Sequence, residues 1–307
     1  MSDIVLHRLE DQAALESSLQ VLLQAPTATD RTQMKLFGLI DASQPPKLAA
    51  LLEELKPFIS DQSEPCNLYD DLKGQEIAAL GPRLISLQST HEANTAACRA
   101  AFNTYNLSLL VSADETKLTT HLRHLREFEI PDGSPALFRY QDTRVATALM
   151  PLLKPAQAAN MLGDAVAWFA PQVCGQAIGW QYAQAPDKIK IAVLRLFEKQ
   201  FAAVDDALFA NTVEQQARET DSSLLEGMNA CATSTLLNER IALGKSKELK
   251  TKKDLSLFAV LSLQLPKGFE SKAPFAQAIE RTVKERITFA KSLEQVPSKE
   301  WEAFERQ

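Results

Sequence analysis

The chain has 307 residues, of which 45% are hydrophobic and 23% charged, so it can form one large or two modest domains and is not largely disordered. Its formal net charge of −6 at pH 7 argues against a dedicated nucleic-acid-binding protein, which needs a basic surface. No stretch approaches the ~18 consecutive apolar residues of a membrane span, and Met1–Glu10 lacks the apolar region of a secretory signal.

The first part of the chain alternates short apolar runs with segments of helical periodicity. Runs of this length suit buried strands, whereas apolar residues three or four positions apart suit one face of a helix. We therefore expect an α/β lobe in which a mixed sheet is flanked by helices. The strands are expected at Met34–Ile40, Arg83–Leu87, Leu107–Val111 and Leu137–Tyr140, with weaker candidates at Ala165–Phe169 and Ile178–Tyr182.

Two helices of this lobe have recognisable starts. Pro45 and Pro46 open a helix whose leucines between Leu48 and Leu55 fall on one face. The segment Ser112-Ala-Asp-Glu115 is typical of a capping box, in which a serine hydroxyl and a glutamate satisfy backbone amides at the helix start. The helix that follows carries an apolar stripe at Leu118, Leu122 and Leu125.

The chain beyond Tyr182 predicts helices only. Thr251-Lys-Lys-Asp254 resembles another capping box. An apolar stripe on one long helix is formed by Phe275, Ile279, Val283, Ile287 and Ala290. Further helices are expected at Asp187–Ala210, Glu214–Ala230 and Ser234–Leu243.

A shift in charge indicates where the lobes divide. Residues 1–180 carry 14 basic and 21 acidic side chains, whereas residues 181–307 carry 19 and 18. We place the boundary near Ala185-Pro186-Asp187, which gives a mixed α/β domain over residues 1–185 and an all-helical lobe over residues 186–307.

The common catalytic and cofactor motifs are missing from the sequence. It contains no GxGxxG, GxxxxGK[ST], GxSxG or HExxH, so a dinucleotide site, a P-loop and a serine-hydrolase elbow lose their usual support. Cys66, Cys98, Cys174 and Cys231 lie far apart without a CxxC pair, and we interpret them as free thiols in a reducing cytoplasm. We expect no cofactor, no bound metal and no catalytic residue.

Two histidines are the strongest candidates for metal binding. On a helix His121 and His124 would lie on one side and could bind one metal ion together with a nearby glutamate. Arg123 and Arg126 belong to the same helix and would repel a cation. We therefore favour the interpretation that the two histidines lie on a surface or line a groove.

Arginines and acidic residues alternate between positions 123 and 144. A cluster of guanidinium groups could form a pocket for a carboxylate or another anion. The acidic residues are almost as numerous as the arginines, so we favour a salt-bridge network that joins a helix, a turn and a strand. The group comprises Arg123, Arg126, Arg139 and Arg144 with Glu127, Glu129, Asp132 and Asp142.

The dense basic run of the chain lies between two expected helices. Such a run is either a solvated loop or a contact for an acidic partner. Trp301, in a charged C-terminal helix, is the best tryptophan candidate for an interface, since Trp168 and Trp180 lie in apolar stretches. The candidate partner-binding residues are Lys245, Lys247, Lys250, Lys252, Lys253 and Trp301.

The order of several segments resembles a known bacterial family. LFGLIDA (Leu36–Ala42) is followed by a GPRLI segment (Gly81–Ile85), an HLRHL helix (His121–Leu125) and FRYQDTRV (Phe138–Val145). This order is similar to the opening strand, "gPyLv" segment, "hLrrl" helix and "fRyyDprv" strand of the type VI secretion effector adaptors, also called Tap or Tec chaperones. Gln141 stands where the family often has an aromatic or another residue.

The resemblance implies a non-catalytic cytoplasmic adaptor, or chaperone. Such a protein binds a toxic effector and helps to load it onto the spike protein, the valine–glycine repeat protein at the tip of the secretion tube. The partners implied are therefore the effector and the spike protein, without nucleic acid and without a membrane span. We expect the motif residues Asp41, Gly81, Pro82, Arg123, Arg126, Arg139, Tyr140 and Asp142 to act structurally.

Two other interpretations remain open. One is an enzyme with an unrecognised site around His121, His124 and Arg139, and the other is a scaffold unrelated to secretion. For the adaptor, we expect residues 186–307 to contribute most to cargo discrimination and residues 1–185 to form the common scaffold.

Overall fold

The computed structural model describes residues 4–24, 33–43, 45–60, 64–72, 74–184 and 192–305. The chain divides into two compact units, Met1–Ala207 and Leu208–Gln307. The boundary proposed near Ala185-Pro186-Asp187 lies outside the described residues, so its position stays a prediction. Within the described residues no helix is both long and apolar enough to cross a membrane.

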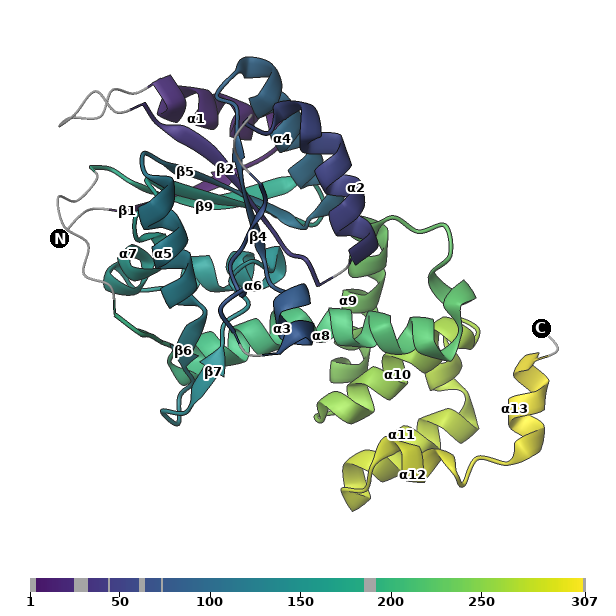
Figure 1. Ribbon diagram of the computed structural model, residues 1–307. Coiled ribbons are helices and arrows are strands. Elements are labelled where there is room, and N and C mark those ends of the chain that lie inside the picture. The colour runs from purple at the N-terminus through teal and green to yellow at the C-terminus, as the bar shows by residue number, and fades with distance from the viewer. Residues whose placement is uncertain are drawn as a thin grey trace. The chain divides into compact units, whose positions relative to one another are not determined.

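The first unit is built around an antiparallel sheet of seven described strands (Figure 1). Both edges of the sheet come from short or terminal segments, and the strongest apolar runs of the sequence lie in the middle. In spatial order the strands are β1 (Ile4–Leu9), β9 (Gln176–Tyr182), β8 (Ala167–Gln172), β5 (Leu107–Ser112), β2 (Lys35–Ile40), β4 (Arg83–Leu87) and β3 (Cys66–Asn67).

Alternation along the strands sends apolar side chains to both faces of the sheet. On β5, Leu109 and Val111 lie on one face and Leu110 on the other, and all three are fully buried. A strand that is apolar on both faces must be covered on both sides, which gives three layers. One face is covered by α1 (Gln12–Gln24), α2 (Pro45–Leu55) and α4 (His91–Thr104), and the other by α5 (Glu115–Leu125), α6 (Thr143–Leu149) and α7 (Pro155–Leu162) (Figure 1).

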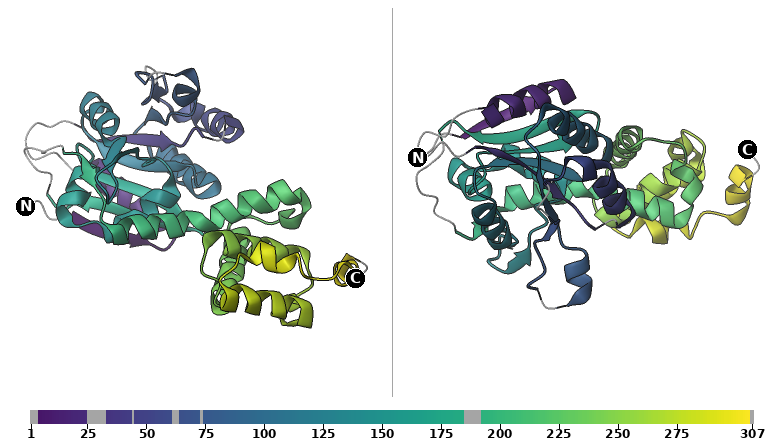
Figure 2. Two further views of the ribbon diagram at one scale, coloured as in Figure 1. Left: turned by 90° about the horizontal axis from the view of Figure 1, so that it is seen from below. Right: turned by 45° about the horizontal axis from the view of Figure 1, so that its top comes forward.

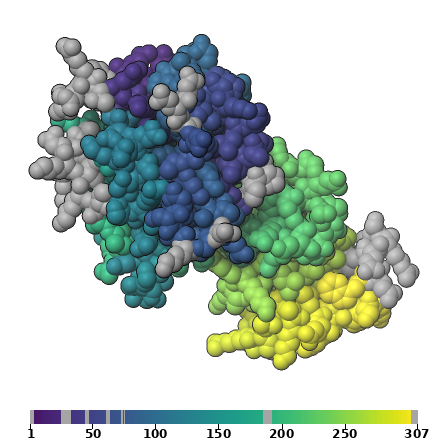
Figure 3. All heavy atoms as spheres, viewed as in Figure 1, coloured from purple at the N-terminus to yellow at the C-terminus, as the bar shows by residue number. Residues whose placement is uncertain are grey.

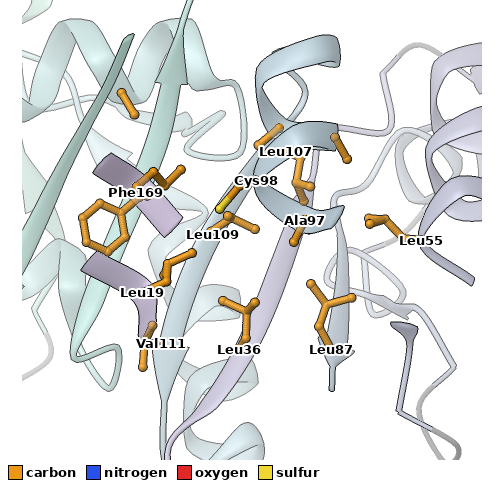
Figure 4. Packing of buried hydrophobic residues seen from close by; sticks show 14 of the residues in the cluster. Leu19, Leu36, Leu55, Leu87, Ala97, Cys98, Leu107, Leu109, Val111 and Phe169 are labelled. Atoms are coloured by element: carbon orange, nitrogen blue, oxygen red, sulfur yellow. The ribbon is translucent and has the colours of Figure 1, made fainter. Parts of the chain in front are cut away.

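The first face carries an aliphatic core. Leu19 of α1, Leu55 of α2 and Cys98 of α4 point toward the leucines and valine of β2, β4 and β5 (Figure 4). Full burial of a side chain as large as leucine stabilises a fold by roughly 1.5–3 kcal/mol. Packing, rather than hydrogen bonding between layers, therefore holds these helices on the sheet.

The second face carries an aromatic core. Tyr140, just before α6, meets the ring of Trp168 on β8 edge-on, with centroids 6.1 Å apart. Phe138 extends this contact to Phe128 of a small second sheet. That sheet runs in the order β10 (Leu194–Arg195), β6 (Glu127–Glu129) and β7 (Pro135–Leu137), with β10 parallel and β7 antiparallel to β6.

The second unit has a helical core of its own. The long helix α8 (Glu198–Thr220) begins in the first unit and ends in the second. Phe258, Phe269 and Phe275 are fully buried and pack tilted or edge-on against one another. The other helices are α9 (Ala230–Ser246), α10 (Lys252–Gln264), α11 (Ala273–Glu285), α12 (Phe289–Leu293) and α13 (Ser298–Glu305).

The fold class expected from the sequence is confirmed: an α/β unit with a central sheet precedes a mostly helical one. The described strands of that sheet are antiparallel rather than mixed in direction. The strands at Met34–Ile40 and Leu107–Val111 are confirmed to within one residue at each end, and Arg83–Leu87 matches without any shift. Two residues of strand, β10, follow the proposed boundary, so the part beyond it is mostly rather than entirely helical. Ile4–Leu9, which the sequence analysis left unassigned, forms the edge strand β1.

Other local expectations are wrong. The strand expected at Leu137–Tyr140 ends at Leu137, because Tyr140 turns into the core ahead of α6. Ser112 does not cap a helix: it ends β5 and donates to the carbonyl of Asp164, while Asp114 caps α5. The long helix expected from Phe275 to Ala290 breaks at Arg286, whose φ of 56° is left-handed.

The cysteines also differ from expectation. Cys66 and Cys98 are free thiols, as expected, but Cys174 and Cys231 are in the disulfide form. The expectation of four free thiols is therefore wrong for two of them. Spacing along a sequence does not determine pairing, because a disulfide depends on distance in space.

Candidate functional site

Two ion pairs fasten α5 to the segment that follows β3. Arg123 Nη2 lies 2.8 Å from Asp70 Oδ1, and Arg126 binds both carboxylate oxygens of Asp71, at 2.5 and 2.9 Å. The two segments lie side by side in teal and blue on the face seen in Figure 3. Hydrogen bonding to Arg126 lowers the pKa of the Asp71 carboxyl. Both arginines are thus engaged by carboxylates from more than 50 residues away.

A second charged group joins the end of β2 to the start of α6. Arg139 Nη2 lies 3.1 Å from Asp41 Oδ2 and 3.5 Å from Asp142 Oδ2. Asp142 caps α6 and also receives two hydrogen bonds from Arg144, at 2.7 and 2.8 Å. The carboxylates of Asp41 and Asp142 are buried, so the arginines provide the opposite charge that such burial needs.

The pKa of Asp142 shows which force prevails. Burial acts to raise this pKa. The hydrogen bonds and charge of Arg144 and the charge of Arg139 lower it by more than burial raises it, so the pKa lies below the usual value. Asp142 is therefore ionised at neutral pH in spite of its burial. Its contacts link a helix cap, a turn and a strand end. Of the network expected between positions 123 and 144, only the part around Asp142 forms, because Arg123 and Arg126 pair with Asp70 and Asp71 instead.

The Gly81–Pro82 step closes the base of a protruding segment. The segment contains α3 (Gln75–Ala79) and stands out from the first unit in both views of Figure 2. Gly81 is buried, and a Cβ at its position would lie 2.6 Å from Cβ of Tyr69, so a side chain does not fit without movement. Pro82 accepts a hydrogen bond from the amide of Leu68 at 3.0 Å.

A surface hollow of about 540 Å³ lies beside the Arg123–Asp70 ion pair, near the start of α5. Arg123 forms part of its wall and also holds Asp70, so the hollow and the ion pair share one guanidinium group. Burial raises the pKa of the Cys66 thiol, which makes it a weak nucleophile. The lining consists of Lys35, Cys66, Ala113, Asp114, Glu115, Thr116, Thr119, Thr120 and Arg123.

The two histidines of α5 occupy different environments. His121 is buried and its Nε2 lies 3.1 Å from the carbonyl oxygen of Met161, whereas His124 is exposed. Gly163 packs so closely on the His121 ring that a Cβ would collide with it. Burial lowers the pKa of His121, so the ring is neutral near pH 7. Among the described residues, no group of three His, Cys, Asp or Glu side chains could hold a metal ion.

The basic run of the second unit surrounds the connection between α9 and α10. Lys245, Lys250 and Lys253 are exposed, while Lys252 places its Nζ 5.3 Å from the centre of the Phe209 ring. Lys247 borders a groove of about 300 Å³ with Ile279 in its lining. The structure therefore brings the lysines together around one turn, where an acidic partner could reach them.

Trp301 lies elsewhere in the second unit. Its ring meets Phe275 edge-on, with centroids 5.0 Å apart, and it packs against the helical core. The side chain is half-buried, so part of its surface contributes to the fold and part faces solvent. The sequence could not reveal this double placement, because α13 contains too few apolar residues to predict its packing.

Comparison with known proteins gives one match. Residues 36–160 match the model of a family described as "Domain of unknown function (DUF4123)". The match begins in β2, ends within α7, and contains all eight residues of the predicted structural motif. Neither the curated proteins nor the solved structures give a significant match. About two fifths of this chain, including both charged groups of the first unit, is thus similar to that family.

Proposed function

We propose that the protein is a non-catalytic adaptor, or chaperone, that binds a type VI secretion effector and helps to load it onto the spike protein. The observation that carries this proposal is the family match over residues 36–160, which coincides with the motifs that resemble the effector adaptors. The proposal places the protein in the bacterial cytoplasm, where effector and spike protein would meet before secretion.

The geometry of the charged groups supports a binding role. Arg123, Arg126, Arg139 and Arg144 each contact a carboxylate of the same unit. These ion pairs stabilise the scaffold, so the arginines of the sequence motif have a structural role that needs no substrate. What differs between adaptors would then lie on exposed surfaces that this scaffold holds in place.

The basic turn and Trp301 remain candidate contacts for the partners. Exposed lysines around the α9–α10 connection suit an acidic surface, and we keep the proposal that residues 186–307 contribute most to cargo discrimination. Reversing the charges of Lys250 and Lys253 should slow association with an acidic cargo and reduce its salt dependence. An unchanged association rate would assign the turn to solvent.

The competing enzyme would have to use His121, His124 and Arg139. His121 is buried with its Nε2 against a backbone carbonyl, and Arg139 is paired with two carboxylates, so the contacts of both residues are already explained within the fold. Elemental analysis of the purified protein tests this alternative, because one equivalent of zinc or iron would favour it over the adaptor.

The decisive experiment is reconstitution with the neighbouring gene products. The chain is co-expressed with a spike protein and with an inactivated toxin, taken from the genes that the adaptor hypothesis places beside its own, and each is isolated in turn by affinity tag. We expect a complex in which the toxin reaches the spike protein only when the adaptor is present. A toxin that binds the spike protein equally well without the adaptor, or binds neither, would contradict the proposed function. Neighbouring genes that encode neither a spike protein nor a toxin would favour a scaffold outside secretion.

A further inference from the structure

Three large apolar side chains are exposed around one point of the first unit. Leu152, at the end of the turn before α7, is 44% exposed, and Phe197 and Phe201, at the start of α8, are 47% and 39% exposed. Phe197 lies immediately before α8 and Phe201 in its first turn, and the amide of Phe201 donates to the carbonyl of Phe197, so the two residues lie one helical turn apart. We call these three residues the Phe197 patch.

The patch is held by a buried glutamine. Gln200 is 5% exposed; its Nε2 donates to the carbonyl of Leu152 at 2.8 Å, and its Oε1 accepts from the amide of Phe197 at 2.9 Å. The side-chain amides of Gln157, in α7, and Gln200 donate to each other, and Gln157 also donates to the carbonyl of Arg195 at 2.6 Å. The backbones that present the patch are therefore fixed to each other before any partner arrives.

A fixed apolar patch is suited to binding. Single exposed apolar residues are common on proteins, but neighbouring aromatic and aliphatic side chains on a rigid support are typical of interfaces. Pre-organisation lowers the entropy lost on association, because these side chains and their backbones need little further ordering.

The charge beside the patch indicates its partner. Lys154 Nζ lies 4.3 Å from the centre of the Phe197 ring, and the residue is exposed. Glu198 and Lys199, the next residues of the helix, are exposed and opposite in sign, so Lys154 decides the charge at this rim. The chemistry fits a segment with two neighbouring apolar side chains and a carboxylate that reaches Lys154.

We propose that the Phe197 patch is the docking site for an apolar, acid-bearing segment of the effector; this rests on the proposed function. The patch falls mostly outside the segment that matches the family, since Phe197 and Phe201 follow residue 160. Leu152 and Lys154 lie inside the matched segment and the two phenylalanines outside it, so we assign the patch to the effector, the partner that would vary between adaptors.

The test compares two double variants of the full chain. Phe197→Ser with Phe201→Ser removes both aromatic rings of the patch, and Ile77→Ser with Leu80→Ser removes two apolar side chains of comparable exposure in the same unit. Binding to the inactivated toxin of the neighbouring gene and to the spike protein is measured for each. We expect the first variant to bind the toxin at least tenfold more weakly and the spike protein unchanged, and the second to keep its affinity for the toxin.

A charge variant gives an independent readout. Lys154→Glu should weaken toxin binding most at low salt, while Lys154→Arg should retain it, because a carboxylate partner needs only the positive charge. If circular dichroism shows that the double serine variant does not fold, toxin binding by Lys154→Glu, which alters an exposed side chain, tests the proposal instead.

Each other outcome overturns the proposal. Unchanged toxin affinity in a folded Phe197→Ser, Phe201→Ser variant excludes the patch, and loss of the spike protein alone assigns it to that partner. A change in oligomeric state would make it an interface between copies of this chain. If the unaltered protein binds no toxin, the proposed function itself fails, whereas loss confined to the patch variant shows that the function holds and where the effector docks.

Discussion

The two units of the chain bury aspartates in different ways. Asp142 of the first unit is surrounded by two guanidinium groups, at 2.7 Å from Arg144 and 3.5 Å from Arg139. Asp254 of the second unit accepts from neutral groups, namely the amide of Phe289 at 2.7 Å and the hydroxyl of Thr251 at 2.6 Å. The first aspartate depends on charge and the second on hydrogen-bond geometry.

The difference reflects what each aspartate connects. Arg139 and Asp41 are 98 residues apart, and their contact ties the end of a central strand to the turn before α6. Asp254 sits in the first turn of α10 and fixes the start of α12, so it joins two helix ends whose amides need acceptors. An α/β layer with irregular connections uses ion pairs between segments, whereas packed helices can use their own unsatisfied amides.

The largest expected loss of stability comes from removing a cation that neutralises a buried carboxylate of the first unit. Arg139→Ala should destabilise the protein by about 2–3 kcal/mol, because it leaves the buried carboxylate of Asp41 without its cation while the amide of Ser43 still donates to it. Denaturant unfolding measures the loss. Unchanged stability together with lost partner binding would instead make Arg139 a contact residue.

Replacing both aspartates by asparagine compares the modes directly. Asp142→Asn should cost about 2 kcal/mol, since the charge that two arginines bind is lost, whereas Asp254→Asn keeps an oxygen for Phe289 and should cost about 1 kcal/mol or less.

The pH dependence sharpens this comparison. The pKa of Asp142 is lowered in the folded protein, so its stabilisation is present above the usual value of 3.8 and is lost as the pH falls through the lowered pKa. The gap between native protein and Asp142→Asn should therefore close in acid. Equal costs for the two asparagine variants at neutral pH would remove the distinction between the units.

His121 gives a smaller effect at milder pH. Burial lowers the pKa of His121 below 6.5. At pH values between 6.5 and the lowered pKa, the imidazole is therefore protonated more in the unfolded chain than in the folded chain. Stability should be complete above about pH 6.5 and fall as the pH drops through that window. His121→Gln should flatten the slope; equal slopes in the variant and the unaltered protein would contradict the assignment.

The smallest effect is expected at the exposed ion pair of α5. The side chains of Arg123 and Asp70 are 34% and 54% exposed, and pairs of this kind contribute about 1 kcal/mol or less, which salt reduces. Arg123→Ala should lower the free energy of unfolding by no more than this at low salt. A loss as large as that of Arg139→Ala would show that Arg123 also supports the hollow beside it.

Much of the fold could be predicted because local patterns agree with it. The run from Leu36 to Ile40 has no polar side chain, which favours a strand covered on both faces, and the structure has such a strand in the middle of the sheet. Thr251 caps α10 as its sequence indicates, since a cap involves only neighbouring residues. The stripe from Phe275 was misjudged because its spacing stays regular across Arg286, where the backbone turns left-handed.

The sequence by itself determined the central strands of the sheet, the change from sheet to helix and the segment that resembles the adaptor family. Only the tertiary structure decided which arginine meets which carboxylate, that His121 is buried while His124 is exposed, and that Leu152 and Phe197 share one support. The reason is range: capping and periodicity act over a few neighbouring residues, whereas these contacts join positions 40 to 98 residues apart and depend on how the sheet, helices and turns pack together.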